Sequence, residues 1–181
     1  MRGKLLVVSG PSGLGLREIV GALLESRADC CAVTPVTARK MKPGEVDGVG
    51  FYFYDLDGWN ALRESGDLLE TTVFAGNDYG TSRRLVEEAL NAGRHVVLSL
   101  ETARAAQLKQ NMPEAICVYM EPTDPAVLEQ RCRAISRSAL ESRVRLETAQ
   151  RERVLSSFCD HRIPSDDPND ALRELNVLLD A

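Results

Sequence analysis

The segment that most constrains this chain runs from Leu5 to Leu24 and reads LLVVSGPSGLGLREIVGALL. Four apolar residues precede a glycine-rich turn, and apolar residues with helical spacing begin near Leu16. A short apolar run bounded by turn residues is typical of a buried strand, and the helical spacing after it indicates a crossover helix. The segment therefore predicts a strand, a phosphate-binding loop and a helix, which together begin an α/β fold.

The loop departs from the phosphate-loop pattern at two positions. The pattern G-x-x-x-x-G-K-[ST] starts at Gly10, reaches its second glycine at Gly15 and then requires Lys followed by Ser or Thr. The chain has Leu16 and Arg17 there. The missing lysine reaches the β- and γ-phosphates, and the missing hydroxyl ligates Mg²⁺. Arg17 lies one position late and would have to fold back to replace the lysine.

The loop keeps its glycines and the free amides at the start of the following helix, and both features favour phosphate binding. We therefore predict a phosphate loop that consists of Gly10, Pro11, Ser12, Gly13, Leu14, Gly15, Leu16 and Arg17. The predicted loss is in the handling of ATP and the metal ion. Removal of one transition-state donor commonly lowers a rate roughly 10²- to 10³-fold.

Strand-length apolar runs recur further along the chain. They lie at 95–100 and 115–120, and helical patterns lie at 17–26, 83–92, 102–110, 124–134, 140–158 and 170–179. Continuous apolar runs suggest strands that are buried on both faces. Their alternation with helices predicts an α/β core in which helical crossovers join the strands of a parallel sheet.

Two segments do not follow this alternation. Segment 34–78 is rich in glycine turns and aromatic residues, which favours a small antiparallel insertion. Its aromatic side chains either form a core of their own or face a planar ligand. Segment 131–145 carries five arginines in an otherwise acidic protein. It is either a solvated helix surface paired with glutamates or a lid that brings guanidinium groups onto phosphates.

Charge and cysteine content exclude several classes of function. A net charge of -5 argues against a general nucleic-acid or membrane-surface binder, so we expect neither as a partner. The five cysteines include no C-x-x-C pair and no cysteine-histidine cluster, which argues against a disulfide framework and a zinc site. We find no signal-peptide pattern and no apolar run of membrane-spanning length. These features favour a cytoplasmic protein.

Three segments, in this order, resemble those of the guanylate kinase family. Residues 5–13 read LLVVSGPSG, residues 42–48 read KPGEVDG and resemble R-x-G-E-x-x-G, and residues 76–82 read GNDYGTS and resemble G-N-x-Y-G-[ST]. The resemblance implies a three-layer P-loop NTPase core at 1–33, 79–130 and 146–181. It also implies a small mixed or antiparallel GMP-binding insertion at 34–78 and a helical lid at 131–145. The reaction that it implies is phosphoryl transfer from ATP to GMP with Mg²⁺.

The resemblance also assigns the acceptor site. The family holds the GMP phosphate with two arginines and a tyrosine, and it holds guanine with a glutamate and a hydroxyl. The matching positions, together with the glutamate of the glycine-rich turn, are Arg39, Lys42, Glu45, Phe51, Glu70, Tyr79 and Thr81. A carboxylate accepts from the N1 and N2 hydrogens of guanine together, so Glu70 suits that base. Lys42 and Phe51 depart from the family pattern because they lack the planar fork and the hydroxyl, respectively.

The resemblance places the metal and lid groups in the second half of the chain. The family has two acidic residues spaced one apart at the end of a strand, and the matching positions here are Ser99 and Glu101. Glu101 is therefore the predicted metal-shell residue. The family's catalytic lid arginines correspond to Arg133 or Arg137 and to Arg145.

The departures in the phosphate loop and at Ser99 leave three interpretations of the function open. The first hypothesis is a guanylate kinase-like protein that binds GMP or phosphate, without a cofactor, and has little or no phosphoryl transfer. The alternative is an active guanylate kinase that uses ATP and Mg²⁺. A third reading is a protein-binding guanylate kinase-like module with its partner in the GMP cleft.

Overall fold

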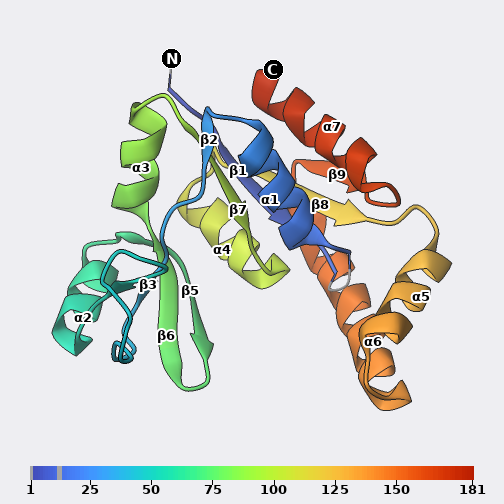
Figure 1. Cartoon of the computed structure of the whole chain (residues 1–181), viewed down its shortest axis with the longest axis horizontal. Coiled ribbons are helices and arrows are strands. Elements are labelled where there is room, and N and C mark those ends of the chain that lie inside the picture. Colours follow the sequence, from blue (N-terminus) through green and yellow to red (C-terminus); the bar gives the residue numbers. More distant parts are fainter. Residues whose placement is uncertain (1, 12–13) are drawn as a thin grey trace.

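The computed structural model describes residues 2–11 and 14–181. The predicted loop residues Ser12 and Gly13 lie outside the described residues. The elements, in chain order, are β1 (Leu5–Ser9), α1 (Leu16–Ser26), β2 (Cys30–Cys31), β3 (Val36–Thr37), β4 (Tyr52–Phe53), α2 (Leu56–Glu64), β5 (Leu68–Phe74), β6 (Asn77–Ser82), α3 (Arg83–Asn91), β7 (His95–Ser99), α4 (Thr102–Asn111), β8 (Ile116–Glu121), α5 (Pro125–Ile135), α6 (Ala139–Leu155), the 3-10 turn η1 (Ser156–Phe158), β9 (His161–Pro164) and α7 (Pro168–Asp180) (Figure 1).

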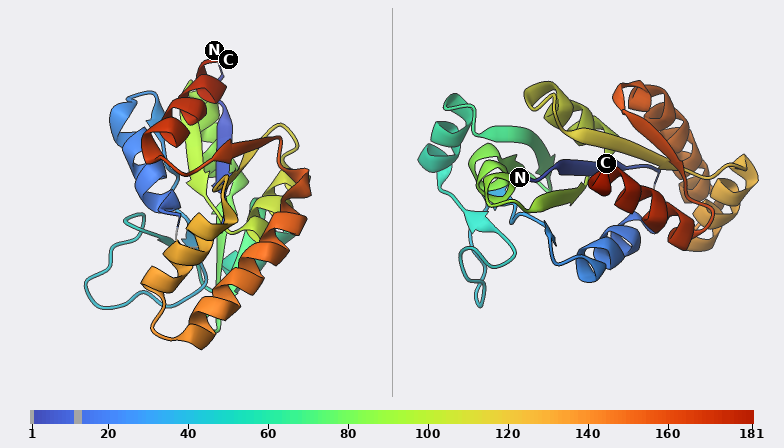
Figure 2. Two further views of the ribbon diagram at one scale, coloured as in Figure 1. Left: turned by 90° about the vertical axis from the view of Figure 1, so that its right-hand side faces the viewer. Right: turned by 90° about the horizontal axis from the view of Figure 1, so that it is seen from above.

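A five-stranded parallel sheet in the order β2-β7-β1-β8-β9 forms the centre of the molecule. Every residue of β1 is buried. Because successive side chains of a strand point to opposite faces, Leu5 and Val7 pack with residues of α3 and α4, whereas Leu6 and Val8 pack with residues of α1 and α7. Figure 2, seen from above, shows α1 and α7 on one side of these strands and α4 on the other. This three-layer arrangement confirms the predicted α/β fold.

A second sheet stands beside the core in the order β4-β3-β6-β5 (Figure 1). It is mixed, because β3 pairs in parallel with β4, and β6 pairs antiparallel with β3 and β5. Val36, Trp59 and Leu68 form a small apolar core there. Helix α4 connects this sheet to the main one through Gln107 and Asn111, whose side chains bond the β5 backbone at Thr71 and Leu69.

At the opposite end of the main sheet, α5 and α6 form a projecting helical hairpin (Figures 1 and 2). The side chains of Asp124 and Ser138 cap the two helices by accepting hydrogen bonds from first-turn amides. The predicted division into core, insertion and lid, with its residue boundaries, stays a prediction. Across the described part of the chain, we find no helix that is long and apolar enough to cross a membrane.

Candidate functional site

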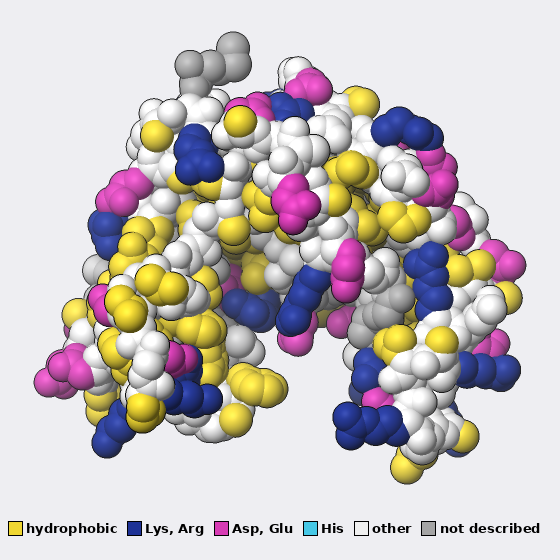
Figure 3. Space-filling model, in the orientation of Figure 1, with side chains coloured by type: hydrophobic (Ala, Val, Ile, Leu, Met, Phe, Trp, Pro, Cys, Tyr) yellow, Lys and Arg dark blue, Asp and Glu magenta, His cyan; other side chains and the backbone are white. Residues whose placement is uncertain are grey.

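Two adjoining cavities lie at the carboxyl edge of the main sheet, next to the second sheet. The first, which we call the insertion cavity, has a volume of about 750 Å³ and is lined in part by Arg39, Lys42, Phe51, Tyr79 and Thr81. The second, the loop cavity, has a volume of about 510 Å³ and is lined by residues of the phosphate loop. The two cavities share a wall that consists of Arg17, Ser99, Leu100, Glu101 and Arg104. The space-filling view shows the molecule hollowed on this side, with Lys and Arg side chains around the hollow (Figure 3).

The described part of the phosphate loop keeps a tight backbone course. A Cβ at Gly10 would lie 2.4 Å from the Met120 carbonyl oxygen, so only glycine fits there. Gly15 has a left-handed backbone, with φ of 70°, and directly precedes α1. Gly15, the N-cap of α1, has no side chain to cap the helix, so among the described residues no cap side chain competes for its first amides at the loop cavity.

The two departures from the loop pattern have different surroundings. Leu16 packs partly against the apolar residues shared by α1 and α7, while it also lines the loop cavity. Arg17 is exposed, lines both cavities, and forms no hydrogen bond or ion pair with any residue that the structure describes. The guanidinium of Arg17 is therefore an uncommitted positive charge beside the phosphate loop.

The predicted phosphate-binding residues of the second sheet come together around Arg39. Its guanidinium donates to both oxygens of Glu45 at 2.6 Å and lies over the rings of Phe51 and Phe53, 5.1 and 4.9 Å from their centroids. The Arg39 bonds, followed by the Lys42 amide, lower the pKa of Glu45 to about 2. The Tyr79 ring packs against Phe51 in a tilted arrangement, with ring centroids 5.6 Å apart and an interplanar angle of 59°. Glu45 and the aromatic rings therefore hold Arg39 in place at the cavity.

The predicted guanine-binding residues are already paired with each other and with Arg104, a residue that the sequence analysis missed. Glu70 is fully buried, and its Oε1 accepts from Thr81 Oγ1 at 2.6 Å. Arg104 donates to the same carboxylate through Nε at 2.5 Å and Nη2 at 2.8 Å. The contact joins residues 34 positions apart, so no local pattern predicts it. The sequence shows only that Arg104 is a basic residue about one helical turn after Glu101.

Glu101 precedes α4 on the wall that the two cavities share, and its side chain makes no capping bond. The sequence analysis missed a second carboxylate nearby, Glu152 of α6, whose pKa is raised by burial and then by the charge of Glu101. No cluster of three or more His, Cys, Asp or Glu residues occurs in the part of the chain that is described. Mg²⁺ often takes only one or two carboxylates from the protein and completes its shell with phosphates and water, so the Glu101 carboxylate on the shared wall fits such an ion.

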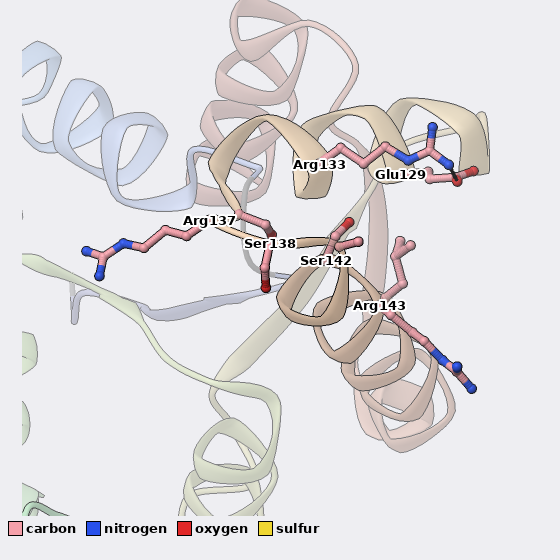
Figure 4. A pocket seen from close by; sticks show the side chains of 9 residues that line it. Glu129, Arg133, Arg137, Ser138, Ser142 and Arg143 are labelled. Carbon is pink, nitrogen blue, oxygen red and sulfur yellow. Dashed lines mark hydrogen bonds and ion pairs between the residues drawn. The ribbon is translucent and has the colours of Figure 1, made fainter.

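The three predicted catalytic arginines lie on the helical hairpin, and two of them, Arg133 and Arg137, line a separate cavity of about 660 Å³ (Figure 4). Arg133 pairs with Glu129, and Arg145 pairs with Glu141 at 2.8 Å, both at i,i+4 spacing. The Arg137 side chain extends away from the other labelled side chains in Figure 4. Among the described linings of the insertion and loop cavities, none of the three occurs. The structure therefore does not bring these arginines together with the phosphate loop.

A parallel sheet with a glycine loop after its central strand, flanked by a second sheet and a helical hairpin, defines a P-loop nucleotide-binding protein. The family model for guanylate kinase matches residues 2–181, so this chain belongs to the guanylate kinase family. It is 36% identical to the guanylate kinase of Synechococcus sp. (strain JA-3-3Ab) over 98% of this chain and 82% of that protein. It is 33% identical to the guanylate kinase of Lactococcus lactis subsp. lactis (strain IL1403) over 99% of this chain and 88% of that protein.

The fold is also similar to a crystal structure of guanylate kinase from Anaplasma phagocytophilum. The TM-score is 0.68 at 23% identity, over 99% of this chain and 85% of that one. These comparisons contradict the first hypothesis, a guanylate kinase-like protein with impaired transfer. Relatives named guanylate kinase match nearly the whole chain at about 35% identity, which supports the active-enzyme alternative instead. The hypothesis was wrong because it made the departures at Leu16, Arg17 and Ser99 decide the activity of the whole site.

Proposed function

We propose that this chain is an active guanylate kinase that transfers the γ-phosphoryl group of ATP to GMP and releases ADP and GDP. The wall shared by the loop cavity and the insertion cavity carries this proposal. A donor phosphate on the loop and an acceptor phosphate beside the second sheet would meet at this wall. The wall holds two arginines and one carboxylate, which are the groups that phosphoryl transfer uses.

On the donor side, Arg17 is proposed to replace the missing lysine. The first amides of α1 would hold the phosphates of ATP, since helix amides and the helix dipole favour anions. Arg17 lies in the first turn of that helix, and its guanidinium has no partner among the described residues. Arginine binds phosphate through a planar fork, so its charge can serve where Leu16 offers none.

On the acceptor side, Arg39, Lys42 and Tyr79 are proposed to hold the phosphate of GMP. Arg39 is mostly buried, and Glu45 occupies one bidentate edge of its guanidinium, which leaves other N–H donors for a phosphate. Phe51 would act through its ring, which packs against both Arg39 and Tyr79. These contacts orient the cation before the substrate arrives, which lowers the entropic cost of binding.

Mg²⁺ is proposed to bind at Glu101, which lies on the wall shared by the two cavities. When bound, the ion supplies charge neutralisation to the reacting phosphates. Glu101 keeps its side chain free of a capping bond, so a metal ion would compete with no helix contact.

The hairpin arginines are proposed to add positive charge from the other side of the phosphates. Arg133 is held by an exposed i,i+4 ion pair with Glu129, and Arg145 pairs with Glu141. An exposed i,i+4 pair contributes only about 0.3–0.5 kcal/mol, so exchange of Glu129 for a phosphate as the partner of Arg133 costs little. Arg137 makes no side-chain ion pair with a described residue and is the most available of the three.

A coupled assay of ADP release with ATP, Mg²⁺ and GMP tests the proposal. We expect a turnover of about 1–100 per second, as for other kinases. AMP, CMP and UMP serve as acceptor controls and should turn over far more slowly. Turnover with GMP no faster than ATP hydrolysis without an acceptor would refute the proposed function.

A further inference from the structure

Arg104 stands between the insertion cavity and the carboxylate that the sequence assigned to guanine. Glu70 is fully buried and does not line the cavity, whereas Arg104 does. Three hydrogen bonds, two from Arg104 and one from Thr81, fall on the two Glu70 oxygens. A base in this cavity would therefore meet hydrogen-bond donors where the resemblance predicted an acceptor.

The guanidinium of Arg104 has a second edge that remains open. It carries five N–H donors, and Glu70 takes the edge formed by Nε and Nη2. The opposite fork, formed by Nη1 and the second Nη2 hydrogen, has no partner among the described residues. Because Glu70 accepts two hydrogen bonds from the edge formed by Nε and Nη2, the orientation of the opposite, open fork is fixed.

The helix that carries Arg104 is also fixed in place. Gln107 accepts from the Thr71 amide at 2.9 Å, and Asn111 donates to the Leu69 carbonyl at 2.9 Å. Both bonds tie α4 to β5, the strand that carries Glu70. Release of Arg104 would leave the buried Glu70 carboxylate without its cation, which is strongly unfavourable. The pair is therefore expected to stay intact when a ligand enters.

We propose that Arg104 reads the O6 and N7 edge of guanine in the acceptor nucleotide, with Glu70 as the residue that positions it. This inference rests on the proposed function and deepens it. O6 and N7 of guanine are two adjacent acceptors that match a guanidinium fork, whereas adenine places an amino donor beside its N7. Val33, Pro35 and Leu98 line the same cavity and supply apolar surface for the face of the base.

Calorimetric titration of the unaltered protein with three nucleotides tests the assignment. 7-Deaza-GMP lacks the N7 acceptor, and IMP keeps O6 and N7 but lacks the 2-amino group. We expect 7-deaza-GMP to bind about tenfold more weakly than GMP, and IMP to bind within about threefold of GMP. The reverse order would overturn the inference, because it would show that the N1 and N2 edge is read.

Substitution of Arg104 tests the role of its planar fork separately from the role of its positive charge. Arg104→Lys keeps the charge and loses the planar fork, so its affinities for GMP and 7-deaza-GMP should become equal within about twofold. The matched control is Arg173→Gln, an exposed arginine of α7 that pairs with Asp170, and it should keep the tenfold preference. A preference that survives in Arg104→Lys would overturn the inference.

The same titrations distinguish this inference from the proposed function. GMP that binds with the expected preference but is not phosphorylated refutes only the kinase. GMP that is phosphorylated while 7-deaza-GMP binds equally well overturns only the role of Arg104.

Discussion

Replacement of Arg17 by Gln removes the uncommitted guanidinium from the shared wall of the two cavities. Arg17 is exposed and has no described partner, so the free energy of unfolding should change by less than about 0.5 kcal/mol. Loss of one preorganised transition-state donor costs about 2.7–4 kcal/mol, which corresponds to roughly 10²- to 10³-fold in kcat. We therefore expect a large fall in kcat without a loss of folded protein. Coupled kinetics with ATP and GMP, together with urea unfolding, measure both quantities.

The matched control is Arg173→Gln, which removes another exposed arginine, from α7, and should leave kcat within about twofold. A second comparison adds Leu16→Lys to the Arg17→Gln variant, because lysine at this position restores the phosphate-loop pattern. Part of the lost activity should return, although Leu16 gives up its packing against the core of α1 and α7. If Arg17→Gln keeps kcat within twofold of the unaltered protein, Arg17 does not replace the lysine.

Three further predictions concern the stability of the site. Arg104→Ala leaves the buried Glu70 without its ion pair and should lower the free energy of unfolding in urea by about 3 kcal/mol; Arg84→Ala, an exposed i,i+4 pair, is the control. Gly80→Ala places a Cβ 2.8 Å from the Glu70 carbonyl oxygen and should lower the free energy of unfolding by about 1–3 kcal/mol. An unchanged urea midpoint would contradict the close approach. The pKa of Glu45 is depressed from 4.5 to about 2, so its contribution to stability is present above pH 4.5 and is lost as the pH falls toward 2. Between pH 5 and pH 2.5 the urea midpoint of the unaltered protein should therefore fall further than that of Glu45→Gln, and equal falls would contradict this role.

The core of the fold could be predicted because its strands carry a strong local signal. The run from Leu5 to Val8 is apolar at every position, as expected for a strand covered on both faces, and all four residues are buried. Strands β2 and β9 were not predicted, because elements of two and four residues show too little periodicity. Helix α2 was also missed, since it lies in a glycine-rich segment that favoured an antiparallel insertion.

The site could be predicted in part. Motif positions placed Arg39, Glu45 and Tyr79 together. In the structure Arg39 and Tyr79 line one cavity, and Glu45 accepts hydrogen bonds from Arg39. Arg104 could not be found in this way, because its partner Glu70 lies on a different element and only tertiary packing brings them into contact. The same holds for Glu152 of α6, whose pKa is raised by burial and then by the charge of Glu101.

The loop substitutions can be understood as an exchange between packing and charge. Leu16 places an apolar side chain against the core where the motif has a cation, and the adjacent position supplies an unpaired guanidinium on the wall that both cavities share. Phosphoryl transfer depends on positive charge at the reacting oxygens and not on the residue that carries it. A motif records one arrangement of that charge along the chain, whereas the electrostatic field sums over Arg17, Arg39 and Arg104 whatever their order in sequence. The departure from G-x-x-x-x-G-K-[ST] therefore predicts a relocated cation, and the kinetics of Arg17→Gln with and without Leu16→Lys measure how completely it was relocated.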